Sequence, residues 1–228
     1  MQRIRILFLH GSNGGPNGTK ARYLRNQGYE VRAPMMPYHW RYPSRWGLNL
    51  ITDHRLVRGL SHSIAVAQAE ESACKPDVIV ASSLGGAVAL NMNSNTPMVL
   101  LAPAVRVHLG GVVRTWVAKT LGREPAWARV VPTMAIRFGK SPRIPQRVRI
   151  LHSLHDTWVP ISSSRDLLRN SPMTDTSALD STQGHNLGRP TFRVPERLIE
   201  VGNDHRLNDS DSLQMLDKCV RDLCSNEQ

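Results

Sequence analysis

Short apolar runs alternate with longer amphipathic stretches along most of this chain. Six runs rich in Val, Ile and Leu predict strands over residues 4–9, 31–33, 78–81, 98–101, 148–152 and 198–201. The stretches between them predict helices over residues 19–27, about 53–74, 85–92, 161–169 and 210–223. Strands that alternate with helices form a mainly parallel sheet flanked by helices, so the predicted fold class is α/β.

Two segments interrupt this alternation. Residues 104–146 separate two predicted strands by more than 40 residues, where one crossover helix would suffice. We interpret this segment as a small, mostly helical cap inserted into one domain that spans residues 1–228, because a chain of this length buries one substantial core. Residues 172–195 are polar and rich in Ser, Thr and Asp, and they predict a loop or the edge of a lid.

The positive charge of the chain is concentrated in one region. The formal net charge is +11, and residues 103–147 hold nine Lys or Arg against one Glu, which accounts for +8. Such a field attracts anionic substrates, lipid headgroups or nucleic acid, and a set of solvated surface arginines is an equally good interpretation. The three cysteines lack C-x-x-C spacing, which argues against a disulfide framework or a metal site and favours a cytoplasmic protein. No run approaches the roughly 20 apolar residues of a membrane span.

The most informative motif runs from the strand at residues 78–81, through a turn of small residues, into the apolar helix that follows. A strained strand–turn–helix of this kind exposes a nucleophile, and it needs small residues two before and two after the central serine. Ala81 and Gly85 meet this requirement around Ser83, whereas Val80 and Leu84 would crowd a turn centred on Ser82. Ser83 is therefore the candidate nucleophile.

A serine nucleophile needs a histidine base, and the base needs a carboxylate to orient it. Asp156 follows the strand at residues 148–152 and precedes a Val-Pro pair that opens the next helix, so we expect it to be the acid. His205 follows the last strand and a Gly-Asn turn, and it is our preferred base. His185 remains the alternative, although no apolar strand leads into it.

The oxyanion of an acyl-transfer intermediate needs preorganised donors. The backbone N–H of Leu84 would supply one, and the glycine-rich loop at residues 10–15 would supply the other through Ser12 or, as a second choice, Asn13. This loop lacks the spacing of a dinucleotide-binding or P-loop motif. We expect His10, Gly11, Asn13 and Trp158 to contact the substrate, with Trp158 offering a flat apolar surface beside the acid.

Together, His10-Gly11, the elbow at residues 81–86, Asp156 with its Val-Pro and the Asp-His-Arg-Leu stretch at 204–207 resemble the α/β-hydrolase superfamily, especially its small bacterial esterase-like members. Ala81 departs from the usual first glycine of the elbow, and the interval from acid to histidine is lengthened. The resemblance implies a sheet of about six to eight strands, an acyl-serine intermediate and no cofactor, and it leaves the substrate open.

These observations lead to one hypothesis with rivals. We expect the chain to be a serine hydrolase that acts on small-molecule carboxylic esters, and the ester could be anionic. We expect no metal and no nucleic-acid partner. The serine nucleophile argues against dehalogenases of the same fold, which need a carboxylate at that position. A thioesterase, a peptidase, or a non-catalytic protein whose basic segment binds an anionic partner are the alternatives.

Overall fold

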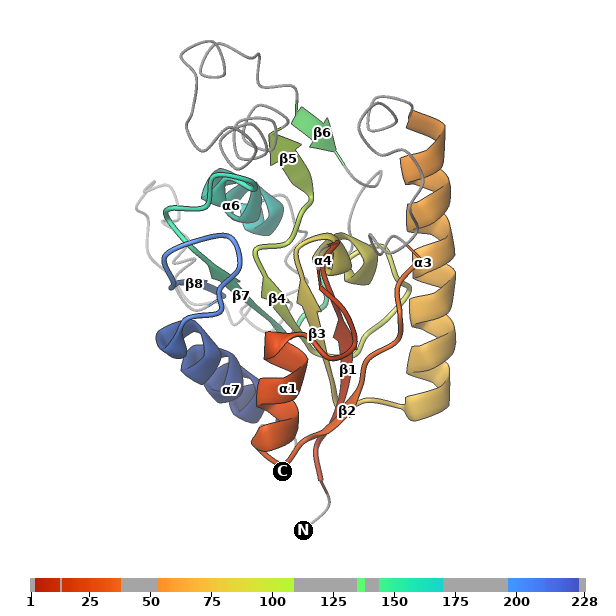
Figure 1. Ribbon diagram of the computed structural model, residues 1–228, viewed down its shortest axis with the longest axis vertical. Helices are drawn as coiled ribbons and strands as arrows, with labels where there is room; N and C mark the ends of the chain where they lie inside the picture. The colour runs from red at the N-terminus through yellow and green to blue at the C-terminus, as the bar shows by residue number, and fades with distance from the viewer. Residues whose placement is uncertain are drawn as a thin grey trace, which may run out of the picture.

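The computed structural model describes residues 3–12, 14–37, 53–108, 135–137, 144–169 and 197–225, and for residues 53–59, 106–108 and 135–137 it describes the backbone only. Its centre is a six-stranded sheet in the order β2-β1-β3-β4-β7-β8, in which every neighbouring pair is parallel (Figure 1). The strands are β1 (Arg5–Leu9), β2 (Glu30–Arg32), β3 (Val78–Ser82), β4 (Met98–Leu101), β7 (Val148–His152) and β8 (Leu198–Glu200). All six were predicted, and the α/β fold class is confirmed.

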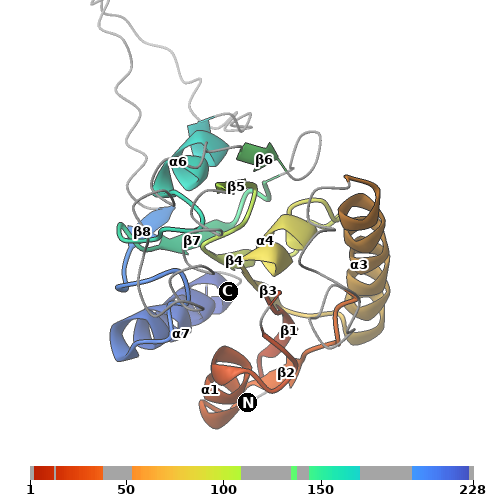
Figure 2. The same cartoon turned by 45° about the horizontal axis from the view of Figure 1, so that its top comes forward.

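Helices cover both faces of this sheet (Figure 2). They are α1 (Thr19–Asn26), α3 (Asp53–Cys74), α4 (Leu84–Ala89), α6 (Ile161–Arg169) and α7 (Ser210–Ser225). Side chains alternate along a strand, so β1 sends Leu7 and Leu9 into a core shared with α3, α4 and α6, while Ile6 and Phe8 enter a core shared with α1 and α7. Strands buried on both faces read as continuous apolar runs, which is why the sequence pattern located them.

The segment between β4 and β7 contains an element that the sequence pattern did not predict. β5 (Arg106–His108) and β6 (Ala135–Arg137) pair as antiparallel strands, apart from the main sheet. The rest of the predicted helical cap, residues 109–134 and 138–143, lies outside the described residues, as does the predicted loop at 172–195. The cap and the single-domain boundary therefore stay predictions.

Parallel strands bring their carboxyl ends to one edge of the sheet, and the loops that leave this edge are where ligands bind in open α/β sheets. The loops after β1, β3, β7 and β8, together with the first residue of α4, carry the candidate site residues other than the alternative base His185. Across the described residues, no helix is both long enough and apolar enough to cross a membrane.

Candidate active site

Ser83 stands at the sharp turn between β3 and α4. Its φ of 53° and ψ of −117° lie in a region that residues other than glycine rarely adopt, at a cost of about 1–3 kcal/mol. The turn is held from β4 and its following loop: the N–H of Ser83 donates to the carbonyl of Leu101 (2.8 Å), and the N–H of Ala104 donates to the carbonyl of Ser83 (2.9 Å). Two backbone hydrogen bonds thus fix the strained residue.

Gly85 lets this turn approach β1. A Cβ at this position would lie 2.2 Å from the carbonyl oxygen of Leu9 and 2.8 Å from that of His10. Because real side chains do not tolerate such contacts with backbone atoms, glycine is required here, as the small-residue rule for the elbow predicts.

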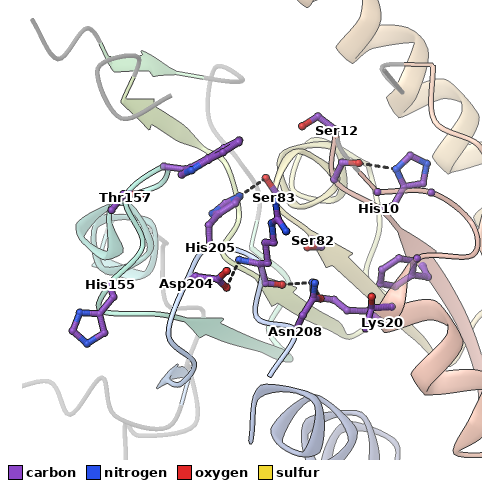
Figure 3. Close-up of a pocket in the computed structure, with 18 residues that line it drawn as sticks. His10, Ser12, Lys20, Ser82, Ser83, His155, Thr157, Asp204, His205 and Asn208 are labelled. Atoms are coloured by element: carbon purple, nitrogen blue, oxygen red, sulfur yellow. Dashed lines mark hydrogen bonds between the residues drawn. The ribbon is translucent and has the colours of Figure 1, made fainter. Parts of the chain in front are cut away.

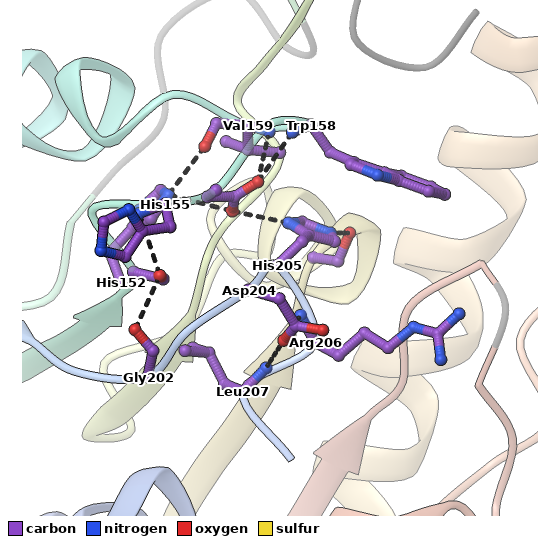
Figure 4. Close-up of polar contacts among 12 residues, drawn as sticks. His152, His155, Trp158, Val159, Gly202, Asp204, His205, Arg206 and Leu207 are labelled. Atoms are coloured by element: carbon purple, nitrogen blue, oxygen red, sulfur yellow. Dashed lines mark hydrogen bonds and ion pairs between the residues drawn. The ribbon is translucent and has the colours of Figure 1, made fainter. Parts of the chain in front are cut away.

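Ser83, His205 and Asp156 form a continuous chain of hydrogen bonds (Figures 3 and 4). The Oγ of Ser83 lies 2.9 Å from Nε2 of His205, and Nδ1 of His205 lies 2.7 Å from Oδ2 of Asp156. A carboxylate only accepts, so Nδ1 carries the proton and Nε2 is free to accept one from the serine hydroxyl. The three residues come from the loops after β3, β8 and β7, whereas His185 lies outside the described residues.

Asp156 is held in its ionised form by its surroundings. Burial by itself would raise the pKa of this carboxyl, but hydrogen bonds from His152 and His205 and from the backbone N–H of Val159 outweigh burial and hold the pKa well below its usual range. The N–H groups of Trp158 and Val159 both donate to Oδ1, at 2.8 and 2.9 Å. The carboxylate is therefore charged and fixed in orientation.

His152 supports this acid, and the sequence analysis did not assign it a role. Its side chain is fully buried, and its Nε2 lies 3.2 Å from Oδ2 of Asp156 and 2.9 Å from the carbonyl of Val159. A carbonyl only accepts, so Nε2 carries a proton, while Nδ1 pairs with the hydroxyl of Ser164 (2.7 Å). His152 thus closes the turn that presents Asp156. The one available signal was its spacing, four residues before the acid.

The loop after β1 lies directly against Ser83. A Cβ on Gly11 would lie 3.1 Å from Cβ of Ser83, so Gly11 permits this approach. His10 fixes the loop: its Nδ1 donates to the carbonyl of Gly11 (2.8 Å), and its Nε2 accepts the N–H of Met36 (3.1 Å). The His10 side chain therefore holds this loop in place through two hydrogen bonds. Ser12, two residues further along the loop, lines the cavity.

The other expected oxyanion donor is the backbone N–H of Leu84 at the start of α4. Leu84 is the first residue of that helix, and the first N–H groups of a helix have no acceptor one turn earlier. Its N–H is thus available beside Ser83. Asn13, the second choice within the glycine-rich loop, lies outside the described residues.

A cavity of about 520 Å³ is bordered by Ser83 and His205 (Figure 3). Its walls include six of the residues singled out from sequence: His10, Gly11, Ser12, Ser83, Trp158 and His205. The Trp158 ring stacks on the His205 imidazole, with centroids 5.5 Å apart and planes 7° apart. One wall of the cavity is thus a flat aromatic surface placed against the candidate base. Among the described residues, no cluster of His, Cys, Asp or Glu suits a metal ion.

Comparison with known proteins assigns the fold. A scan against family models found no match, and neither did a search of curated proteins. Among solved structures, the chain is similar to a monoacylglycerol lipase from Paleococcus ferrophilus, with a TM-score of 0.57, 14% identity, and coverage of 98% of this chain and 95% of that one. It is also similar to alpha/beta hydrolase domain-containing protein 10 from mouse, with a TM-score of 0.55, 16% identity, and coverage of 98% of this chain and 90% of that one. A third similar structure is the pyrethroid hydrolase PytH, with a TM-score of 0.54, 14% identity, and coverage of 100% of both chains.

The sheet order, the elbow and these similarities together define an α/β-hydrolase fold. The identities are low, so the similarity extends to the fold, and the chemistry has to be argued from the site itself.

Proposed function

We propose that this protein is a serine hydrolase that cleaves carboxylic esters through an acyl-serine intermediate. The observation that carries the proposal is the chain of hydrogen bonds from Ser83 through His205 to the buried Asp156, with the serine at a strained turn. Nucleophile, base and orienting acid are the three parts that acyl transfer by serine requires.

The proposed reaction proceeds in two halves. The Oγ of Ser83 attacks the acyl carbon as its proton passes to Nε2 of His205, and the imidazolium returns that proton to the leaving alcohol. Asp156 stabilises the imidazolium. Water then attacks the acyl-serine with His205 again as base, which releases the acid and restores the serine. The N–H groups of Leu84 and Ser12 would stabilise the oxyanion in both halves.

A fluorophosphonate probe tests the nucleophile. We expect it to label the wild-type protein and the Ser82→Ala variant but not Ser83→Ala, since Ser82 is the neighbouring hydroxyl and also lines the cavity. Absence of labelling on a folded wild type would refute the proposal and favour a binding protein. Labelling lost in Ser82→Ala but kept in Ser83→Ala would place the nucleophile one residue earlier.

A substrate panel then separates the members of this class. p-Nitrophenyl esters of increasing acyl length, the matching thioesters and the matching anilides distinguish an esterase from a thioesterase and a peptidase. We expect the oxygen esters to give the largest kcat/KM. Larger kcat/KM values for the thioesters or anilides would change the assigned leaving group to a thiol or an amine, and the proposed acyl-serine chemistry would still hold.

A further inference from the structure

Two basic side chains, Lys20 and Arg206, form part of the cavity wall together with Ser83. Lys20 comes from the first turn of α1, and Arg206 follows the candidate base directly in sequence. Trp158 lies at the other side of the catalytic pair (Figure 4). A molecule bound at Ser83 therefore meets an aromatic wall on one side and two cations on the other.

Lys20 is a buried cation, since it is only 8% exposed. Its Nζ donates to two uncharged oxygens, the backbone carbonyl of Arg206 and Oδ1 of Asn208. Burial lowers the pKa of Lys20 to about 8, an effect that Asp204 and Asp209 partly offset and Arg206 reinforces, so the ammonium form still dominates at pH 7.

An ammonium has three N–H donors, and this one uses two. Within the described part of the chain, no carboxylate forms an ion pair with Lys20, and its third N–H has no acceptor. Asp204 and Asp209 stabilise this buried charge without forming an ion pair with it, and Lys20 borders the cavity, so a group bound there can supply the missing acceptor.

Arg206 has a fixed backbone and an exposed side chain. Its N–H donates to Oδ1 of Asp204 (2.8 Å), and its carbonyl accepts from Lys20. Among the described residues, its guanidinium has no hydrogen-bonding or ion-pair partner. Asp204, the one acid among the described residues that line the cavity, already uses Oδ1 to accept the N–H groups of Arg206 and Leu207. Among the described residues that line the cavity, the two cations therefore outnumber the one acid, and Asp209, which also acts on Lys20, is not part of the wall.

We infer that the part of the cavity lined by Lys20 and Arg206 is a subsite for an anionic group, a carboxylate or a phosphate, carried by the ester substrate. The inference rests on the proposed function and deepens it, because it assigns the substrate class. Arg206 would form a charge-assisted, two-pronged contact with the anion, and Lys20 would give it the third N–H.

Matched esters test the subsite. The acyl-side pair is the mono-p-nitrophenyl ester of glutarate against p-nitrophenyl valerate, which has the same chain without the carboxylate. The leaving-group pair is 3-carboxy-4-nitrophenyl butyrate against 4-nitrophenyl butyrate. We expect the wild type to favour the anionic member of at least one pair by about tenfold in kcat/KM, and Arg206→Gln to reduce that ratio by about tenfold, in line with the strength of charged hydrogen bonds. Lys20→Met should reduce the same ratio.

Arg22→Gln is the matched control. Arg22 lies two residues along α1 on the exposed surface and is not part of the cavity wall, so this variant makes the same change in net charge away from the subsite. We expect its ratio to equal that of the wild type. Equal losses in Arg206→Gln and Arg22→Gln would overturn the subsite, because a long-range field would then explain the preference. Should Lys20→Met fail to fold, the comparison of Arg206→Gln with Arg22→Gln still decides.

A binding measurement separates this inference from the proposed function. The glutarate monoester is titrated calorimetrically into Ser83→Ala and into Ser83→Ala/Arg206→Gln, neither of which needs to turn it over. We expect about tenfold weaker binding without Arg206. Equal affinities, or a wild type that hydrolyses neutral esters with no preference for either anion, would overturn the subsite. Binding that depends on Arg206 in a protein that no fluorophosphonate labels would instead support the subsite and refute the hydrolase.

Discussion

Replacing Gly85 with alanine is expected to inactivate the site more than it destabilises the fold. The added Cβ would lie 2.2 Å from the carbonyl oxygen of Leu9, against about 3.4 Å for an ordinary contact, so α4 and β1 must separate by about 1.2 Å. Both contacting groups are backbone, so no side-chain rotation can relieve the clash. Alanine favours a helix over glycine by about 1 kcal/mol, whereas overpacking costs about 1–3 kcal/mol. The net effect is a modest loss of stability.

The same displacement acts directly on the chemistry. Ser83 immediately precedes α4 and the loop with Ser12 continues β1, so a shift of this size moves the proposed nucleophile relative to the proposed oxyanion donors. A misplacement of about 1 Å can cost about 10²-fold in rate. We therefore expect the rate of fluorophosphonate labelling by Gly85→Ala to fall by about 10²-fold, while urea denaturation shows a folded protein whose free energy of unfolding has fallen by at most about 2 kcal/mol.

Gly28→Ala provides the control. Gly28 has a φ of 89°, and no atom lies within 4 Å of the place that a Cβ would occupy, so alanine there adds backbone strain of about 1–2 kcal/mol without a clash. It lies between α1 and β2, away from the elbow. We expect a similar loss of stability with an unchanged labelling rate. Labelling by Gly85→Ala at the rate of Gly28→Ala would refute the argument that this close approach sets the geometry of the site.

Four further predictions concern the proposed acid, the proposed base and His152. His205→Ala should remove nearly all esterase turnover while His185→Ala keeps most of it, and the reverse result would reassign the base. Asp156→Asn should lower kcat by about 10⁴-fold, because an amide at this position favours the wrong imidazole tautomer. Because the pKa of Asp156 is lowered in the folded protein, its ionised carboxylate stabilises the fold above about pH 4, and this stabilisation is lost as the pH falls through that pKa. The free energy of unfolding of Asp156→Asn, measured from denaturation curves, should therefore fall less on acidification than that of the wild type. His152→Leu leaves the carbonyl of Val159 and a buried hydroxyl without their partner, and urea denaturation should show a loss of about 1–3 kcal/mol.

The main sheet could be predicted from sequence because its strands are buried on both faces. Residues 78–81 and 98–101 are continuous apolar runs, and the observed strands β3 and β4 match them to within one residue. β5 and β6 could not be found in this way. Each has only three residues, too few for a period to emerge, and the 26 residues between them, 109–134, separate the partners in sequence.

The candidate site shows a similar division. Ser83 and Asp156 could be proposed because each lies within four residues of the end of an apolar strand, and that context is local. His152 and Lys20 could not, because their roles depend on tertiary contacts. In sequence, His152 is the last residue of a strand and Lys20 is an ordinary basic residue near a helix start. Only the packing of the acid turn and of the loop after β8 buries them.

The position of β8 explains why the loop that carries the proposed base His205 is held by contacts at both of its ends. β8 is three strands away from β3 in the sheet, roughly 14 Å at ordinary strand spacing, so the loop after β8 must cross the edge of the sheet to bring His205 to Ser83. At the start of this loop, the hydroxyl of Ser153 donates to the carbonyl of Gly202 (2.8 Å). At its far end, Nζ of Lys20 donates to the carbonyl of Arg206. The loop that carries His205 is thus anchored on both sides. This loop also places Arg206 at the cavity wall, so the feature that brings the proposed base to the proposed nucleophile brings the proposed anion-binding cation with it.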